Sequence, residues 1–285
     1  MHFPSSRRRA FSLVELLVVV GVVAVLVAVL MPVLGKARAH ADRVKCAANL
    51  RSMGQALTMY VQQTGYYPCW RITDLTKPGK HFAVWPTRLR LFMGGDQSAF
   101  YCPSSDERCR WRTDGRAPPG HWGAKAEARH VGFGYDLREY MLQIDGAGMY
   151  FSYGYNAWGA RGGSGYGLSD QLGLGDWVNL NAPRGTDWTS GELRAGRVRS
   201  ASEMIAIADA AVDGNIDYAV QPDPRSPFML PGTTHGGGAN VLYCDGHVSW
   251  HPQRDLVLTG DNRRDLARAR LWDNTNQPPE TMTRR

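Results

Sequence analysis

The sequence lacks the local motifs that mark several classes of enzyme. It has no G-x-S-x-G turn, which presents the serine of α/β-hydrolases, and no H-E-x-x-H pair, which binds zinc in metalloproteases. One glycine-rich stretch is present at Gly162-Gly163-Ser164-Gly165, but no Gly-Lys-Ser/Thr follows it, which excludes a phosphate-binding loop. These absences predict that the protein is not an enzyme.

The chain also lacks a strong charge imbalance. Its formal net charge is +7, and three of the positive charges belong to Arg7, Arg8 and Arg9 near the N-terminus. The remainder of the chain is therefore close to neutral for its length. No basic stripe with interleaved aromatic residues occurs, so nucleic acid is not an expected partner.

Charge is missing altogether from one segment near the N-terminus. Leu16 to Gly35, between Glu15 and Lys36, are twenty residues without a charged side chain. As a helix they would span about 30 Å, the thickness of the hydrocarbon core of a bilayer. The basic residues 7–9 on the N-terminal side predict a cytoplasmic N-terminus and an extracytoplasmic remainder.

Three ordinary explanations exist for such a segment. A secretory signal peptide could be cleaved after Ala37-Arg38-Ala39, although the apolar run exceeds the usual length of about 7–15 residues. A twin-arginine signal could use Arg8-Arg9-Ala10-Phe11, although such signals are less hydrophobic. A plain signal anchor fits the length. None of the three accounts for Glu15, because a carboxylate inside a membrane costs about 2.5–3.5 kcal/mol at mid-bilayer and usually has a partner.

The start of the apolar segment reads Ala10-Phe11-Ser12-Leu13-Val14-Glu15. It resembles the class III leader of type IV pilins and type II secretion pseudopilins, in which a small residue, usually Gly, precedes Phe-Thr-Leu-x-Glu. The resemblance implies that prepilin peptidase cleaves between Ala10 and Phe11 and that Phe11 becomes N-methylated. It also implies that the helix stays in the mature protein, where Glu15 pairs with the amino group of Phe11 of a neighbouring subunit.

A helical pattern continues beyond the apolar segment to about Gln63. Apolar residues recur at three- and four-residue steps from Val44 to Val61, and charged residues fill many other positions. One helix is therefore expected, apolar all round at first and amphipathic afterwards. The predicted organisation is a leader at 1–10, a transmembrane and assembly helix at 11–35, its amphipathic continuation at 36–63, an extracytoplasmic head at 64–260 and a charged tail at 261–285.

The head is expected to be α+β and pilin-like, with the long helix packed on an antiparallel sheet that carries long irregular insertions. Met204 to Ala208 is apolar and fits a buried strand. Asp245-Gly246 lies between two alternating runs, which predicts a hairpin with a type I′ turn. Residues 70–200 show no such regularity, and their role is not evident from the sequence.

A second motif lies in this hairpin region. His235 and Asp245-Gly246 have the H-x9-D-G spacing, which resembles the signature of prepilin-type processing-associated domains. Cys46-Ala47-Ala48-Asn49-Leu50-Arg51, with Gly65-Tyr66-Tyr67-Pro68, resembles the start of the pseudopilin head common in planctomycete and verrucomicrobial proteins.

Two interpretations of this region stay open. In the structural one, Asp245-Gly246 forms the turn and His235 hydrogen-bonds a nearby backbone group. In the chemical one, Asp209, His235, Asp245 and His247 gather around a metal or act as an acid–base set. No cofactor is required; calcium is possible because the pseudopilins that this chain resembles often carry it, although no D-x-D-x-D loop is present.

The five cysteines form an odd set, so at least one thiol is free or intermolecular. Disulfides are allowed outside the cytoplasm, and Cys102 with Cys109 is the expected pair because the two lie close in sequence. They could instead be half of a zinc site, although their spacing is wider than the usual C-x2–4-C arm.

These features predict a single-pass inner-membrane protein with a structural function in a type II secretion or type IV pilus-like filament. Expected partners are prepilin peptidase with its N-methyltransferase activity, other pseudopilins and the inner-membrane assembly platform. One alternative is a membrane-anchored binding module, an adhesin or substrate-recognition subunit. Another is a metal-dependent hydrolase built on Asp209, His235 and Asp245.

Overall fold

The computed structural model describes residues 13–74, 81–110, 142–143, 150–159, 172–175, 177–179, 191–260 and 262–277. The chain divides into two compact units, Met1–Ala41 and Asp42–Arg285. The predicted cleavage site at Ala10 and Phe11 lies outside the described residues.

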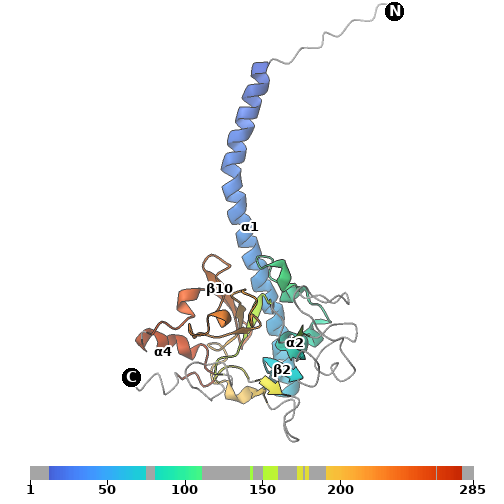
Figure 1. Cartoon of the computed structure of the whole chain (residues 1–285), viewed down its shortest axis with the longest axis vertical. Helices are drawn as coiled ribbons and strands as arrows, with labels where there is room; N and C mark the ends of the chain where they lie inside the picture. Colours follow the sequence, from blue (N-terminus) through green and yellow to red (C-terminus); the bar gives the residue numbers. More distant parts are fainter. Residues whose placement is uncertain are drawn as a thin grey trace, which may run out of the picture. The chain divides into compact units, whose positions relative to one another are not determined.

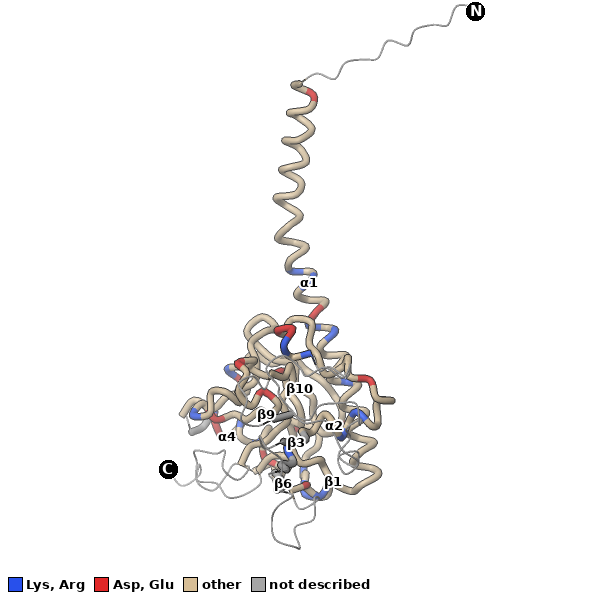
Figure 2. Tube along the Cα trace, turned by 45° about the vertical axis from the view of Figure 1, so that its right-hand side comes forward, with Lys and Arg blue, Asp and Glu red and all other residues tan. Residues whose placement is uncertain are grey.

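Helix α1 (Leu13–Thr64) has 52 residues and includes Pro32. It confirms the prediction of one long helix, and Gly65, with φ at +79°, ends it. In the first unit no charge interrupts the helix between Glu15 and Lys36, as the tan stretch of Figure 2 shows. The large apolar side chains of residues 13–34 are 42–76% exposed. Among the described residues, α1 is a helix long and apolar enough to cross a membrane.

The second unit contains a five-stranded sheet in the order β11-β10-β8-β5-β9. Figure 1 labels its strand β10. All neighbouring strands are antiparallel except β5 and β9, which run parallel, so the sheet is mixed. Its strands are β5 (Tyr153–Asn156), β8 (Ile205–Asp209), β9 (Ala219–Val220), β10 (Gly238–Tyr243) and β11 (Val248–Pro252). Strand β8 confirms the buried strand predicted from Met204 to Ala208, displaced by one residue.

Smaller elements surround this sheet. A four-stranded sheet has the order β4-β3-β2-β6, and β1 pairs with β7. The strands are β1 (Tyr66–Tyr67), β2 (Arg71–Asp74), β3 (His81–Val84), β4 (Leu142–Gln143), β6 (Trp177–Asn179) and β7 (Leu193–Arg194). The helices are α2 (Trp85–Arg90), α4 (Asn262–Arg270) and the 3-10 turns η1 (Leu91–Met93), η2 (Ser98–Phe100), η3 (Glu107–Cys109), η4 (Ala195–Arg197), η5 (Pro227–Met229) and η6 (Gln253–Asp255).

The second half of α1 packs on this unit through one face. The buried residues follow helical spacing and include Cys46, Leu50, Met53, Leu57 and Tyr60. Val44, which the sequence pattern placed on the same face, is 51% exposed. The approach to β10 is close at Gly54, where a Cβ atom would lie 2.7 Å from Leu242 Cδ1. A Cβ atom at this position would require the Leu242 side chain to shift.

The Asp-Gly hairpin exists, but the predicted type I′ turn is wrong. The amide of Gly246 donates to the Tyr243 carbonyl oxygen at 2.9 Å, and the amide of Tyr243 donates to the His247 carbonyl oxygen at 3.0 Å. Gly246 has φ at +94°, whereas Asp245 has no positive φ. This is a type I turn closed by a left-handed glycine, the usual three-residue hairpin loop. A two-residue loop matches the twist of the strands only with the backbone angles of a type I′ or II′ turn. A three-residue loop can match it with a type I turn followed by a left-handed residue.

The segment predicted as a charged tail contributes to the core. Helix α4 is followed by Trp272, which is fully buried and donates from Nε1 to the Leu256 carbonyl oxygen at 3.0 Å. Ala269 is buried in the same cluster, beside Ile205 and Val241 of the sheet. Helix α4 is thus rich in charged residues but has one side that is buried against the core.

Replacing Gly154 by alanine is expected to lower the free energy of unfolding by about 1–3 kcal/mol, the usual cost of overpacking. A Cβ atom on this β5 residue would meet Val220 Cγ1 at 2.5 Å and the Ala219 carbonyl carbon at 2.7 Å, which forces β9 away. Denaturant unfolding in detergent measures the change. Gly196→Ala is the control, because its Cβ would have no atom within 4 Å. Equal stability of the two variants would contradict the close approach of β5 and β9.

Candidate functional site

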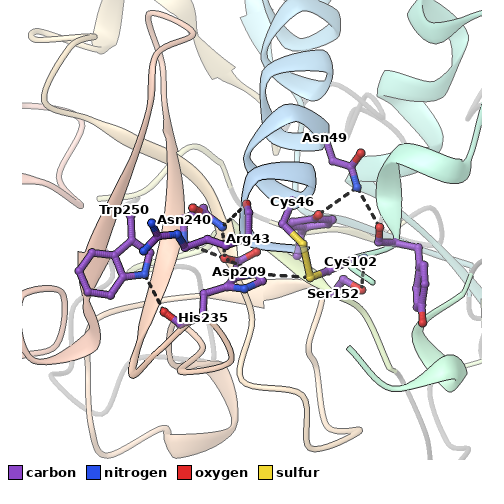
Figure 3. A network of polar contacts seen from close by, with 11 residues as sticks. Arg43, Cys46, Asn49, Cys102, Ser152, Asp209, His235, Asn240 and Trp250 are labelled. Carbon is purple, nitrogen blue, oxygen red and sulfur yellow. Dashed lines mark hydrogen bonds and ion pairs between the residues drawn. A yellow bond between two sulfur atoms is a disulfide. The ribbon is translucent and has the colours of Figure 1, made fainter. Parts of the chain in front are cut away.

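Four chemically active side chains meet inside the second unit (Figure 3). Cys46 lies on the inward face of α1, and Cys102 follows η2. Asp209 is the last residue of β8, and His235 lies in the loop before β10. All four are buried, so the site forms only when helix, sheet and loops have packed.

Cys46 and Cys102 form a disulfide with a Cα–Cα distance of 5.3 Å. The predicted pairing of Cys102 with Cys109 is therefore wrong. Cys109 is a buried free thiol at the end of η3, and burial raises its pKa to about 12. Nearness in sequence did not decide the pairing, because α1 brings Cys46 to Cys102 across 56 positions. Asn49, on the next turn of α1, donates from Nδ2 to the Tyr101 carbonyl oxygen at 2.9 Å and holds the two segments together.

Asp209 is a buried carboxyl group with a 2% exposed surface. Its Oδ2 atom accepts two hydrogen bonds from Asn240, at 2.7 Å from the backbone amide and 3.0 Å from Nδ2. Its Oδ1 atom has no hydrogen-bond partner among the described residues. Burial raises the pKa of Asp209 to about 7, and the bonds from Asn240 oppose this shift.

The imidazole of His235 faces both neighbours. Its Nε2 atom lies 3.4 Å from Cys102 Sγ and 3.5 Å from Asp209 Oδ2, while within the described part of the chain Nδ1 has no hydrogen-bond partner. Burial lowers the pKa of His235, and the positive charge of Arg43 lowers it further, against the opposing effect of Asp42. The ring is therefore held in its neutral form.

The backbone around His235 is fixed by Trp250. The indole Nε1 of Trp250 donates to the His235 carbonyl oxygen at 2.9 Å, and the Arg43 guanidinium lies 5.6 Å from the Trp250 ring centroid. The predicted hydrogen bond from His235 to a backbone group is not what its ring makes, because the ring faces the Cys102 sulfur and the Asp209 carboxyl group. The bond to Trp250 is instead accepted by the His235 backbone carbonyl group. Gly238 allows the loop to run close to the Trp250 ring, because a Cβ atom at this position would lie 2.7 Å from that ring.

The predicted set of Asp209, His235, Asp245 and His247 does not form one site. Asp245 and His247 pair with each other at the exposed hairpin turn, with His247 Nδ1 2.6 Å from Asp245 Oδ1. Asp209 contacts Asn240 near the start of β10, and Asp245 follows the end of that strand. Tyr243, the last residue of β10, lies about 10 Å from Asn240 at about 3.4 Å per residue, and Asp245 follows it in the turn.

Sequence reasoning missed Cys46 and Asn240 as members of the cluster. Cys46 carried a signal, because it falls on the same helical face as Leu50, Met53 and Leu57 and was therefore directed inward. Asn240 carried none. Its role follows from the pairing of β8 with β10, which sets its amide beside the Asp209 carboxyl group.

The four ligand atoms of this cluster all lie within 4.8 Å of one another. Two sulfurs, an imidazole and one carboxylate do not fit calcium, which takes six to eight oxygen ligands. The set is typical of a soft or borderline metal such as zinc. The calcium expectation gains no support from these residues.

Glu15 lies in the first turn of α1, in the first unit. A family model for the prokaryotic N-terminal methylation motif matches residues 5–31, which include Ala10, Phe11 and Glu15. No curated protein and no solved structure matches the chain. The match supports a type IV prepilin-like leader, and with it a precursor of the pilin or pseudopilin type.

Proposed function

We propose that this protein is a structural, pseudopilin-like subunit of a type II secretion or type IV pilus-like filament. The observation that carries the proposal is the coincidence of the methylation motif at residues 5–31 with the apolar half of α1. The same helix continues into a folded unit, which it joins through a buried face. A cleaved signal peptide would not need that continuation.

The assembly mechanism rests on two properties of the first unit. Its exposed apolar side chains are stable only when they are shielded from water. Lipid shields them before assembly, and the helices of neighbouring subunits shield them in a filament. Glu15 is a carboxylate at the start of this apolar helix, where a positive partner offsets its desolvation. Cleavage before Phe11 creates such a partner, the methylated amino group of the next subunit.

Location and partners follow from this mechanism. The subunit resides in the inner membrane with its N-terminus in the cytoplasm, where prepilin peptidase and its methyltransferase activity process the leader. The inner-membrane assembly platform then extracts it into a polymer with other pseudopilins. The head faces outward, in a compartment where the Cys46–Cys102 disulfide is stable.

The hydrolase hypothesis has less support than a structural role. Asp209 and His235 are closed off from solvent, and Asp245 lies on a different part of the hairpin. A substrate would have no access to the carboxyl group or the imidazole without opening the core. A buried metal-ligand set of this kind is typical of structural sites.

Mass spectrometry of the mature N-terminus tests the proposal. We expect a chain that begins at Phe11 with one methyl group on its amine, because the proposed cleavage between Ala10 and Phe11 falls within the matched motif. In cells that lack prepilin peptidase, the chain should keep its leader. A mature chain that begins near His40 would instead indicate signal-peptide cleavage and would overturn the assignment.

A further inference from the structure

The Cys46, Cys102, Asp209 and His235 cluster has a feature that a disulfide alone does not explain. A disulfide is uncharged and needs neither a carboxyl group nor an imidazole beside it. Here both groups are buried against it, and Asp209 Oδ1 and His235 Nδ1 have no hydrogen-bond partner among the described residues. A carboxyl group and an imidazole are costly to bury without compensation, and the atoms that face one another and the sulfur, Asp209 Oδ2 and His235 Nε2, point to a ligand shared by the cluster.

The distances in the cluster match the edges of a tetrahedral zinc site. With Zn–S of about 2.3 Å and Zn–N or Zn–O of about 2.0–2.1 Å, the sulfur–nitrogen edge is about 3.5 Å and the nitrogen–oxygen edge about 3.4 Å. The corresponding distances are 3.4 Å from Cys102 Sγ to His235 Nε2 and 3.5 Å from Nε2 to Asp209 Oδ2. The two sulfurs, which are bonded to each other in the disulfide, would have to separate to about 3.8 Å.

The charges around the cluster also suit a divalent cation. Two thiolates and the Asp209 carboxylate carry three negative charges, of which Zn²⁺ neutralises two. Arg43, which lies over the ring of Trp250 beside His235, supplies a further positive charge.

We propose that Cys46, Cys102, Asp209 and His235 form a zinc site when the two cysteines are reduced, and that the disulfide is the metal-free state of the same site. An external dithiol passes two electrons and two protons to the disulfide and itself becomes a disulfide. Zn²⁺ then displaces the two thiol protons into solvent. In the reverse direction an external disulfide takes up the two electrons, together with two protons from solvent, and becomes a dithiol, while the Cys46–Cys102 bond forms and Zn²⁺ leaves.

This site is independent of the proposed filament function, since it lies wholly within the second unit. Its consequence is that the link between α1 and the Cys102 segment persists in both redox states, as a covalent bond or as a metal bridge. Zinc is preferred to calcium or magnesium because three of the four ligands are sulfur or nitrogen. All four ligand residues are buried, which is typical of a structural metal site and not of a catalytic one.

Metal analysis of the full chain in detergent tests the proposal. One sample is purified with a phosphine reductant from lysis onward, and a second is oxidised; each is incubated with Zn²⁺ and desalted. We expect about one zinc per reduced chain and none per oxidised chain. Cobalt in the reduced sample should show thiolate charge-transfer absorption and the visible bands of a tetrahedral ion. A reduced chain that binds no zinc would overturn the proposal.

Three variants assign the ligands. Asp209→Asn keeps an oxygen that can accept a hydrogen bond from Asn240 but removes the negative charge. It should weaken zinc binding by more than about tenfold, since changing even a residue that only supports a metal ligand commonly costs that much affinity. Cys46→Ser should abolish the cobalt charge-transfer bands of the site. Cys109→Ser, a buried thiol outside the cluster, should bind zinc as the parent does. Undiminished binding by Asp209→Asn or Cys46→Ser, in protein with a native circular dichroism spectrum, would contradict this ligand set.

Discussion

Glu15→Ala is expected to leave the protein in the membrane and to reduce its incorporation into filaments by about 100-fold or more. Removing one partner of a buried ion pair costs about 3–5 kcal/mol, which corresponds to more than a hundredfold in an association constant. Insertion should persist, because the twenty uncharged residues from Leu16 to Gly35 are unchanged. The loss should therefore appear at the step where one subunit meets the next.

The measurement is the amount of protein in sheared filaments relative to the amount in the membrane. Glu15→Gln is the matched control for shape, because it keeps the size of the side chain and removes the charge; it should fail as alanine does. Glu15→Asp keeps the charge on a shorter side chain and should assemble in part. Normal incorporation of Glu15→Ala would show that the carboxylate has no role in assembly.

Cys102→Ser is expected to lower the free energy of unfolding of the oxidised, zinc-free protein by about 4 kcal/mol. The disulfide closes a loop across 56 positions, and the chain-entropy estimate for a loop of this length is about 4 kcal/mol. Domains are commonly stable by only about 5–15 kcal/mol, so the effect should be a large part of the total. The measurement is denaturant unfolding in detergent with a metal chelator present.

The sensitivity of unfolding to reductant provides the control. The parent protein should lose about the same stability when reduced, and Cys102→Ser should be insensitive to reductant. Cys109→Ser removes a thiol of similar burial that forms no disulfide, so its reductant-induced loss should match that of the parent. A Cys109→Ser variant without this loss would restore the pairing of Cys102 with Cys109.

Local patterns were sufficient to predict the long helix, the buried strand and the existence of the hairpin. Periodicity from Val44 to Val61 and the uncharged run before it determine α1, because both properties belong to consecutive residues. The Asp245-Gly246 pair likewise marks the hairpin. The turn type was not predictable, because it depends on strand register. Pairing of Leu242 with Val248 leaves a three-residue loop, whereas a two-residue Asp245-Gly246 loop needs a register shifted by one residue.

The candidate site could be predicted only in part. His235 and Asp209 were recognised as chemically capable residues, but their partners come from segments far away in sequence. Cys46 reaches Cys102 because of the face that α1 presents, and Asn240 reaches Asp209 because of strand register. Such contacts depend on tertiary packing, which no local pattern encodes. The separation of Asp245 and His247 from Asp209 has the same origin.

The position of Cys46 on α1 also has a mechanical meaning. The second unit begins at Asp42, so a pulling force transmitted along the helix meets the disulfide within about one turn of entering that unit. The load can then pass through a covalent bond into the Cys102 segment, and the apolar face further along the helix is not sheared. In the proposed filament, a tensile load along α1 would reach this crosslink before the apolar contacts further along the helix.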